Sequence, residues 1–300
     1  MPQYNLQKAK HNGINKPPKN IDENCVSISS DTTDFLTILQ CNIGGAPQSR
    51  LAVGSTLRTY INLHSPTIIV LTETKRSRKY IPVLPGYGLF TLNPLPGSSG
   101  GIAFYYKDSL QWRISKVLAS SKNSIMWVHL QHHRSRISDL YICAVYAVHS
   151  GGHNDMRTSF WKELGGSTTK FQEKQGSRIL VGDFNSRLGP ITGDHDTNAN
   201  QDELLSFIND HSLLNMNIIR AFGKYTFHNI SNGNRSIIDY LLTDMDECKI
   251  PEHEVLPGSL GTSAQTAHKA ILSKIMISLK TSPLGSNKRK PREAQFVRAQ

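Results

Sequence analysis

The sequence predicts a fold of the α/β class, because strand-like apolar runs recur along the chain and stretches of helical spacing lie among them. The runs are short and rich in branched side chains, which is typical of buried strands. The hydrophobic fraction of 38% is enough to fill the core of one domain of ordinary size. We therefore expect a single folded domain over residues 34–279.

Each predicted strand is an apolar run, and in one case Gly182 ends it. Helical spacing of apolar residues occurs in three places. We interpret these residues as the core-facing sides of helices, with no catalytic or binding role. The predicted strands cover residues 36–41, 67–72, 101–106, 110–117, 124–130, 140–146, 178–181, 236–238 and 270–279. The helical stripes are Val53, Leu57 and Ile61, then Phe160 and Leu164, and finally Leu204, Leu205 and Ile208 ahead of Leu213 and Leu214.

Both ends of the chain are expected to form tails outside the domain. Residues 1–33 are polar and lack the apolar segment of a signal peptide, which is typical of disorder. Residues 280–300 carry the basic cluster Lys288-Arg289-Lys290-Pro291-Arg292, which could be a nuclear localisation signal, a DNA-binding arm or a solvated linker. No apolar run is long enough to span a membrane, so we expect no membrane partner.

Charge points to a polyanionic partner such as DNA. The formal charge is +11, of which +5 lies in residues 280–300 and +5 in the expected domain. The cysteines Cys25, Cys41, Cys143 and Cys248 show neither paired spacing nor the spacing of zinc ligands. A reducing, intracellular compartment is therefore expected.

The string Val181-Gly182-Asp183-Phe184-Asn185 places a carboxylate and a carboxamide just past an apolar strand. An Asp that takes a proton from water, beside an Asn that cannot titrate, forms a plausible hydrolytic pair. A strand followed by an Asx turn would give the same string without any chemistry. Further polar residues near apolar runs favour the hydrolytic interpretation: Asn42, Glu73, Tyr146, Asp239 and His268.

Taken in order, these motifs resemble the endonuclease/exonuclease/phosphatase superfamily, and within it the apurinic/apyrimidinic-endonuclease-like branch. The chain is most similar there to the endonuclease domains of LINE-type, non-LTR retrotransposons. The resemblance extends from about Leu36 to about Leu279. It rests on Gln40-Cys41-Asn42-Ile43, Leu71-Thr72-Glu73-Thr74, Ser99-Gly100-Gly101-Ile102-Ala103, Val145-Tyr146-Ala147, Gly182-Asp183-Phe184-Asn185, Tyr225-Thr226-Phe227 and Ser236-Ile237-Ile238-Asp239-Tyr240.

The resemblance implies a four-layer α/β/β/α sandwich, with two mixed sheets flanked by helices. It also implies a DNA endonuclease that hydrolyses a phosphodiester bond and nicks target DNA for a retrotransposon in the nucleus. Such a domain is normally fused to a reverse transcriptase, but the Tyr-x-Asp-Asp polymerase signature is missing from this sequence. A catalytically impaired DNA-binding or scaffold protein and a small-phosphoester or phosphoinositide phosphatase are the alternatives.

The same resemblance assigns roles to the polar residues. Glu73 would bind Mg²⁺, with Mn²⁺ as a possible substitute, and Asn42 would support this metal site. Asp183 would deprotonate the attacking water that Asn185 positions. The remaining roles fall to His268, which would stabilise phosphoryl charge, to Asp239, which would keep His268 cationic, and to Tyr146, which would contact the scissile phosphate.

Two positions depart from the family's usual pattern. Ala267 precedes His268 where the family has an aspartate, and this loss should weaken Mg²⁺ binding or, if that aspartate is indispensable, inactivate the enzyme. Ala147 follows Tyr146 where relatives generally have a proline, which puts the phosphate-side loop in question.

DNA selection is expected in residues 226–236, because Asn232-Gly233 is a strong two-residue hairpin signal. In LINE endonucleases the equivalent hairpin enters the DNA groove beside the cut. An ordinary surface hairpin would carry the same signal. The DNA-contacting residues implied by the resemblance are Thr226, Asn232, Asn234, Arg235 and Ser236.

Overall fold

A computed structural model describes residues 35–44, 50–75, 81–96, 100–133, 137–259 and 266–277. The two expected tails, 1–33 and 280–300, lie outside the described residues, as does the end of the last predicted strand. None of the helices in the described part of the chain is both long and apolar enough to cross a membrane.

Within the described residues, one sheet has eight strands and is mixed. Its order is β11-β10-β14-β1-β2-β4-β3, and β13 pairs with β14 beside this path. β1 and β2 run parallel, whereas the other pairs are antiparallel. The strands are β1 (Phe35–Asn42), β2 (Ile68–Thr72), β3 (Tyr87–Leu92), β4 (Ile102–Lys107), β10 (Phe227–Asn229), β11 (Arg235–Ser236), β13 (Glu252–Ser259) and β14 (Thr266–Met276).

The second sheet has six strands among the described residues, in the order β5-β6-β7-β8-β12-β9. It is mixed as well, because β7 and β8 run parallel while their neighbours are antiparallel. Its strands are β5 (Trp112–Ser120), β6 (Ile125–His132), β7 (Leu140–Tyr146), β8 (Ser177–Asp183), β9 (Leu214–Asn215) and β12 (Asp239–Thr243).

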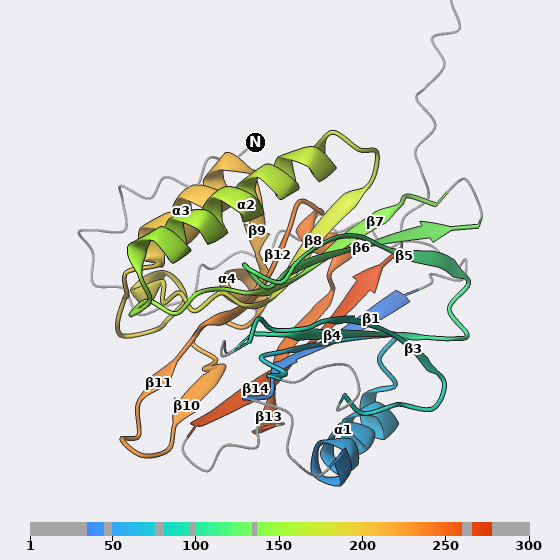
Figure 1. Cartoon of the computed structure of the whole chain (residues 1–300), viewed down its shortest axis with the longest axis horizontal. Helices are drawn as coiled ribbons and strands as arrows, with labels where there is room; N and C mark the ends of the chain where they lie inside the picture. The colour runs from blue at the N-terminus through green and yellow to red at the C-terminus, as the bar shows by residue number, and fades with distance from the viewer. Residues whose placement is uncertain are drawn as a thin grey trace, which may run out of the picture.

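The sheets pack face to face and helices cover their outer faces, which confirms the predicted α/β/β/α sandwich (Figure 1). α1 (Arg50–His64) lies on the first sheet, with Leu57 buried among its strands. α2 (Asn154–Gln172) and α3 (Gln201–Asp210) lie on the second sheet, with Phe160 and Leu204 buried in the same cluster. The shorter helices are α4 (Met216–Arg220), η3 (Gly189–Ile191) and η4 (Glu247–Lys249).

The core between the sheets explains the continuous apolar runs. All five residues of β2 are buried, because one face meets the other sheet and the opposite face meets α1. Ile38 and Val70 of the first sheet pack in one cluster with Ile142 and Val181 of the second. The central strands therefore carry the clearest signal in the sequence.

Besides β12, three strands of three or more residues were not predicted, and none of them contains a long apolar run. β3 has Gly88 and is mostly half-buried at the edge of its sheet. β13 contains two glutamates and Pro257, which are unusual inside central strands. The third is β10, which has only three residues.

The predicted strand over residues 236–238 is displaced in the structure. β11 ends at Ser236, and β12 begins at Asp239, so Asp239 opens a strand and does not follow one. β12 runs antiparallel to β8 with Asp239 paired to Asp183. The start of one strand and the end of the other therefore meet at the same edge of the sheet.

The cysteines only partly match the expected pattern. Cys41 and Cys143 form no disulfide and are buried in strands, where a thiol acts as a small apolar side chain. Cys248 is disulfide-bonded, which the spacing did not predict. The expected reducing compartment therefore gains no support from Cys248.

Replacement of Gly182 by alanine should strongly destabilise the protein. Gly182 has φ +148°, and a Cβ there would overlap the carbonyl oxygen of Val145 on the neighbouring strand. We expect a loss of about 3 kcal/mol or more in the free energy of unfolding, measured by denaturant titration. Gly166→Ala is the matched control, because a Cβ on this exposed position of α2 meets nothing within 4 Å. It should stabilise the protein by about 0.5 to 1 kcal/mol.

Candidate active site

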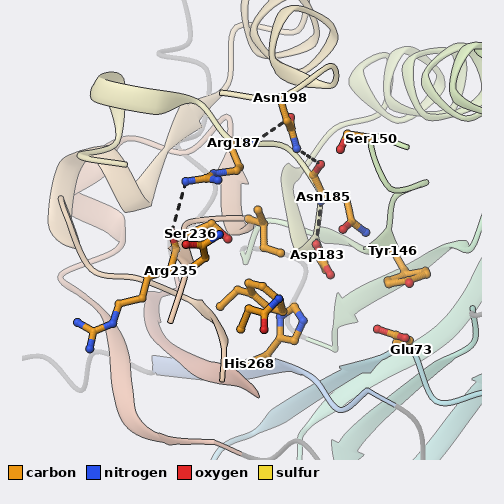
Figure 2. Close-up of a pocket in the computed structure, with 14 residues that line it drawn as sticks. Glu73, Tyr146, Ser150, Asp183, Asn185, Arg187, Asn198, Arg235, Ser236 and His268 are labelled. Atoms are coloured by element: carbon orange, nitrogen blue, oxygen red, sulfur yellow. Dashed lines mark hydrogen bonds between the residues drawn. The ribbon is translucent and has the colours of Figure 1, made fainter. Parts of the chain in front are cut away.

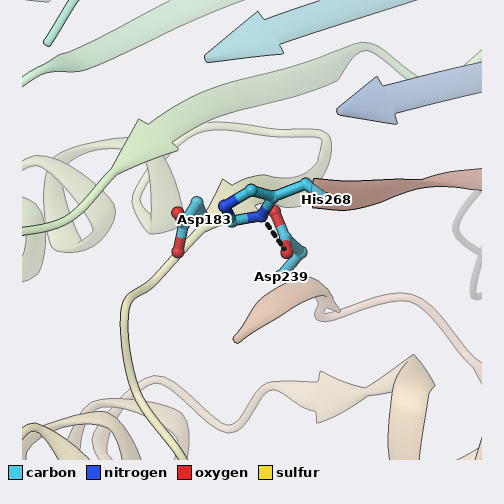
Figure 3. A group of neighbouring side chains, drawn as sticks. All are labelled: Asp183, Asp239 and His268. Carbon is cyan, nitrogen blue, oxygen red and sulfur yellow. Dashed lines mark hydrogen bonds and ion pairs between the residues drawn. The ribbon is translucent and has the colours of Figure 1, made fainter. Parts of the chain in front are cut away.

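Asp183, Asp239 and His268 come from three strands of two different sheets and meet at one edge of the sandwich (Figure 3). Their ligand atoms all lie within 4.8 Å of one another, and all three side chains are buried. Two carboxylates in such proximity repel each other unless a cation lies between or beside them. His268 supplies one positive charge, and a bound metal could supply more.

His268 is paired with Asp239 as the resemblance implied. Its Nδ1 donates to Oδ2 of Asp239 over 3.0 Å. Burial alone would lower the pKa of the imidazole, but Asp239 beside the ring and Asp183 nearby raise it to about 9. His268 is therefore a cation at neutral pH, which suits a group that stabilises developing negative charge.

Asp239 is held in place by buried polar groups. Its Oδ1 accepts from Nε2 of Gln40 over 3.1 Å, and its carbonyl accepts from Nδ2 of Asn217 over 3.0 Å. The hydroxyl oxygen of Thr226 accepts from the backbone N–H groups of Ile238 and Asp239. The expected contact between Thr226 and DNA does not fit this position, because the side chain is fully buried. Thr226 positions Asp239 instead.

Asn42 links the acidic residues of the two sheets. Its Nδ2 donates to Oε2 of Glu73 and to Oδ2 of Asp183, in both cases over 2.8 Å. The Oδ1 of Asn42 accepts from the N–H of Gly44 over 2.8 Å, which fixes the orientation of the amide. Asn42 therefore sets the position of Glu73 relative to Asp183.

Glu73 follows β2 in a strained backbone conformation. Its φ is +54°, in the left-handed region that costs a non-glycine residue about 1 to 2 kcal/mol. Its Oε1 lies 2.6 Å from Nζ of Lys75, which also donates to the carbonyl of Gly44. Strain at such a position commonly accompanies function.

The donor set fits a hard divalent cation. The carboxylates of Glu73, Asp183 and Asp239 converge here, and the positive charges beside them come from His268 and Lys75. Carboxylate oxygens are the ligands preferred by Mg²⁺ and Mn²⁺. The described residues thus allow the expected role of Glu73. The carboxylates of Asp183 and Asp239 could also hold a metal, whereas His268 as a cation cannot be a ligand at neutral pH.

Asp183 is poised to exchange a proton near neutral pH. Burial, together with the negative charge of Asp239, raises the pKa of Asp183 to about 7. The cation of His268 and hydrogen bonds from Asn42 and from the N–H of Asn185 oppose this rise. A carboxyl group with a pKa close to the working pH is suited to general base catalysis.

Asn185 adopts a left-handed conformation, with φ +47°, which Asn tolerates better than most residues. Its N–H donates to Oδ1 of Asp183, and its Nδ2 donates to the carbonyl of Ala147 over 2.8 Å. The carbonyl of Asn185 accepts from Nδ2 of Asn198 and of Asn200. These two asparagines were missed in the sequence because they lie in a loop without an adjoining apolar strand.

The two departures from the family pattern occupy different places. The N–H of Ala147 donates to the carbonyl of Asp183 over 2.8 Å, a bond that a proline could not make. Ala267 lies in β14 beside His228 of β10. Successive side chains of a strand point to opposite faces, so Ala267 faces away from the side that carries His268.

A polar pocket of about 360 Å³ opens above the acidic cluster (Figure 2). Tyr146 and Glu73 lie on one side of it and Arg187 on the other, with Asp183 and His268 between them in this view. Phe227 forms an apolar wall and packs edge-on against the ring of His268. The pocket is lined by Glu73, Tyr146, Ser150, Asp183, Asn185, Arg187, Asn198, Phe227, Asn229, Asn234, Arg235, Ser236, Ile238 and His268.

The expected hairpin is present, but its turn differs from the prediction. The N–H of Asn229 donates to the carbonyl of Asn234, and the N–H of Gly233 donates to the carbonyl of Asn229, so four residues form the loop. Only Gly233 in this loop has positive φ, whereas a two-residue type I′ turn needs two such residues.

The hairpin residues differ in their access to a ligand. Asn232, Asn234 and Arg235 are exposed, whereas Ser236 is buried. Asn234, Arg235 and Ser236 line the pocket formed by the described residues, and Asn232 does not.

The family model described as endonuclease/exonuclease/phosphatase family matches residues 39–251. Comparison with curated proteins gives no match. Similar solved structures have 13 to 17% identity to this chain, so they bear on the fold alone.

Three solved structures share this fold. The AP endonuclease LMAP from Leishmania major has 13% identity and a TM-score of 0.64, covering 81% of this chain and 88% of its own. The endonuclease domain of TRAS1, a telomere-specific non-LTR retrotransposon, has 17% identity and a TM-score of 0.60. The match covers 80% of this chain and 98% of the TRAS1 chain. The 3′ phosphatase NExo from Neisseria, bound to a product DNA hairpin, has 14% identity and a TM-score of 0.63. The match covers 80% of this chain and 99% of the NExo chain.

Asp183→Asn should stabilise the metal-free protein at pH 8. The folded-state pKa of Asp183 is about 7 against an ordinary value of 3.8, so ionisation of this group weakens the folded state as pH rises from about 4 to 7. The amide removes this cost and should add on the order of 2 kcal/mol to the free energy of unfolding at pH 8. The gain should shrink toward pH 4. Denaturant titrations with EDTA at both pH values measure it, and an equal gain at each would contradict the pKa assignment.

Proposed function

The chain belongs to the endonuclease/exonuclease/phosphatase family, and from this premise we propose that it is a metal-dependent DNA endonuclease that nicks target DNA, as in non-LTR retrotransposition. The observation that carries the proposal is the buried group of Asp183, Asp239 and His268 beside Glu73, at the floor of an open polar pocket. This arrangement offers a base, a cation and a metal ligand to one phosphate.

Hydrolysis of a phosphodiester bond requires activation of water and stabilisation of negative charge. Asp183 takes the proton of the attacking water, and Asn42 and the N–H of Asn185 hold its carboxylate in orientation. His268, kept cationic by Asp239, donates a hydrogen bond to a phosphoryl oxygen. A divalent cation, Mg²⁺ or Mn²⁺, held by Glu73 would supply Lewis-acid polarisation of the phosphate.

Tyr146 completes the phosphate side of this proposal. It lies at the carboxyl end of β7, lines the pocket and flanks Glu73 in Figure 2. A phenolic hydroxyl can donate to a phosphate oxygen without changing charge. We assign Tyr146 the contact to the scissile phosphate.

DNA and a reverse transcriptase domain are the proposed partners, and the nucleus is the proposed location. Similarity to the TRAS1 endonuclease domain supports the retrotransposon context, since both chains share the fold over most of their length. The positive formal charge of +11 supports a polyanionic substrate.

The chain should convert supercoiled plasmid to the nicked form in the presence of Mg²⁺ or Mn²⁺ and lose this activity in EDTA. Glu73→Gln and Asp183→Asn should each lower the nicking rate by a factor of about 100 or more, because each removes a metal ligand or the base. Glu252→Gln is the matched control, since Glu252 of β13 pairs with Lys274 of β14 and neither residue lines the pocket. Circular dichroism should show all variants folded.

Two outcomes would count against the proposal. Nicking by both site variants at the parent's rate would place the chemistry elsewhere. A folded parent without activity in either metal would favour the catalytically impaired DNA-binding protein.

The β10–β11 hairpin is proposed to select the cut position. Replacement of Asn232, Asn234 and Arg235 together by alanine, with Gly233 kept, should redistribute nicks along a mapped DNA, because groove contacts contribute about 1 to 3 kcal/mol of discrimination. The overall nicking rate should fall only modestly. Sequencing of nick sites from parent and variant measures this, and identical profiles would exclude the hairpin from selection.

A further inference from the structure

Arg187 lines the pocket, yet the chemistry described so far does not use it. We propose that Arg187 binds a backbone phosphate other than the one that is cut, so that the substrate is a polynucleotide and not a small phosphoester. This inference rests on the proposed function and assigns its substrate class from a residue outside the catalytic group.

The guanidinium of Arg187 is held through its Nε and Nη2 atoms. Its Nε donates to Oδ2 of Asp194 over 3.1 Å, and its Nη2 donates to Oδ1 of Asp194 over 2.5 Å. Nη2 also donates to the carbonyl of Arg235 and lies 3.0 Å from Asp196. Nη1 has no hydrogen-bond partner within the described part of the chain, so two N–H donors remain free.

Asp194 is a rigid anchor for this orientation. Its side chain is 0% exposed, and it accepts from the N–H of Ile237 over 2.9 Å and from that of Asp196 over 3.2 Å as well as from Arg187. A carboxylate with its oxygens occupied in this way cannot rotate without the loss of several bonds. The Nη1 group of Arg187 is therefore fixed in position before any ligand arrives, which lowers the entropic cost of binding.

The position of Arg187 suits a second phosphate. In Figure 2 it lies on the hairpin side of the pocket, with Arg235 and Ser236, while Glu73 lies on the opposite side. The side chain is 20% exposed, so it remains accessible. A phosphate bound between Glu73 and His268 leaves the Arg187 side of the pocket to the continuing strand.

Local charge indicates a directional contact. Arg187 forms ion pairs with Asp194 and with Asp196, whose side chain is 70% exposed, and Arg235 adds a second positive charge at the same pocket. The net charge of these four groups is zero, so simple attraction cannot hold a phosphate here. The N–H donors of Nη1 are fixed in direction by the planar guanidinium and can donate to a phosphate oxygen, whereas a lysine ammonium offers only a point charge.

Arg187→Lys tests the proposal because it keeps the charge, and with it an ion pair to Asp194, while it removes the Nη1 donors. Binding is measured by fluorescence anisotropy of a labelled DNA duplex in EDTA, over a series of salt concentrations. Hydrolysis is measured on plasmid DNA and on bis(p-nitrophenyl) phosphate, a small diester with a single phosphate. Arg113→Lys is the matched control, because Arg113 is exposed on β5 at the far edge of the second sheet.

We expect Arg187→Lys to raise the Kd for the duplex about five- to tenfold, with little change in the salt dependence, and Arg113→Lys to match the parent. The loss of kcat/KM on plasmid should exceed the loss on the small diester by a similar factor. Equal losses on both substrates together with a lower Tm would reduce Arg187 to a structural role, and an unchanged Kd would overturn the proposal.

The two proposals can fail separately. A parent that binds the duplex through Arg187 but hydrolyses neither substrate would refute the nuclease activity and retain the phosphate contact. A parent that hydrolyses the small diester as well as it does plasmid, and whose duplex affinity is insensitive to Arg187→Lys, would refute the polynucleotide assignment alone. A parent that fails to bind the duplex would refute the contact.

Discussion

The contact on which the site depends is the pairing of Asp239 with Asp183 across β12 and β8, compensated by the imidazolium of His268. Antiparallel register alone brings the two carboxylates to one edge, and burial makes their mutual repulsion expensive. Folding tolerates this cost only because His268 arrives from the other sheet with its positive charge. Stability and chemistry are thus coupled. The repulsion that weakens the fold also raises the pKa of Asp183 to about 7, close to the pH at which a general base works.

This dependence makes the packing between the sheets part of the catalytic geometry. Asn42 and His268 belong to β1 and β14 of one sheet, whereas Asp183 and Asp239 belong to the other. The branched apolar side chains between the sheets fix the distance between these pairs. A cavity in that core would therefore alter the site without touching any polar residue.

The central strands and the acidic residues at their ends could be predicted from the sequence, because continuous apolar runs such as that of β2 occur only where both faces are covered. The pairing partners could not be predicted in the same way. Nothing near Thr226 in the sequence indicates that its hydroxyl supports Asp239, and nothing near Arg187 indicates its bond to Asp194. Edge strands such as β3 and β13 were missed because half-exposed surfaces accept polar residues and glycine.

Thr226 precedes the β10–β11 hairpin and binds the backbone of Asp239 through its hydroxyl oxygen. The start of the hairpin is therefore attached to the acidic cluster, whereas the loop after Asn229 is not. The carbonyl of Thr226 accepts from the N–H of Lys269, and Phe227 pairs with His268, so the first residues of the hairpin cannot move independently of the chemistry. Beyond Asn229 the loop has no such ties to the catalytic strands among the described residues. Under the proposed function, residues of this loop can therefore be exchanged, and the target sequence changed, without disturbing the acidic cluster.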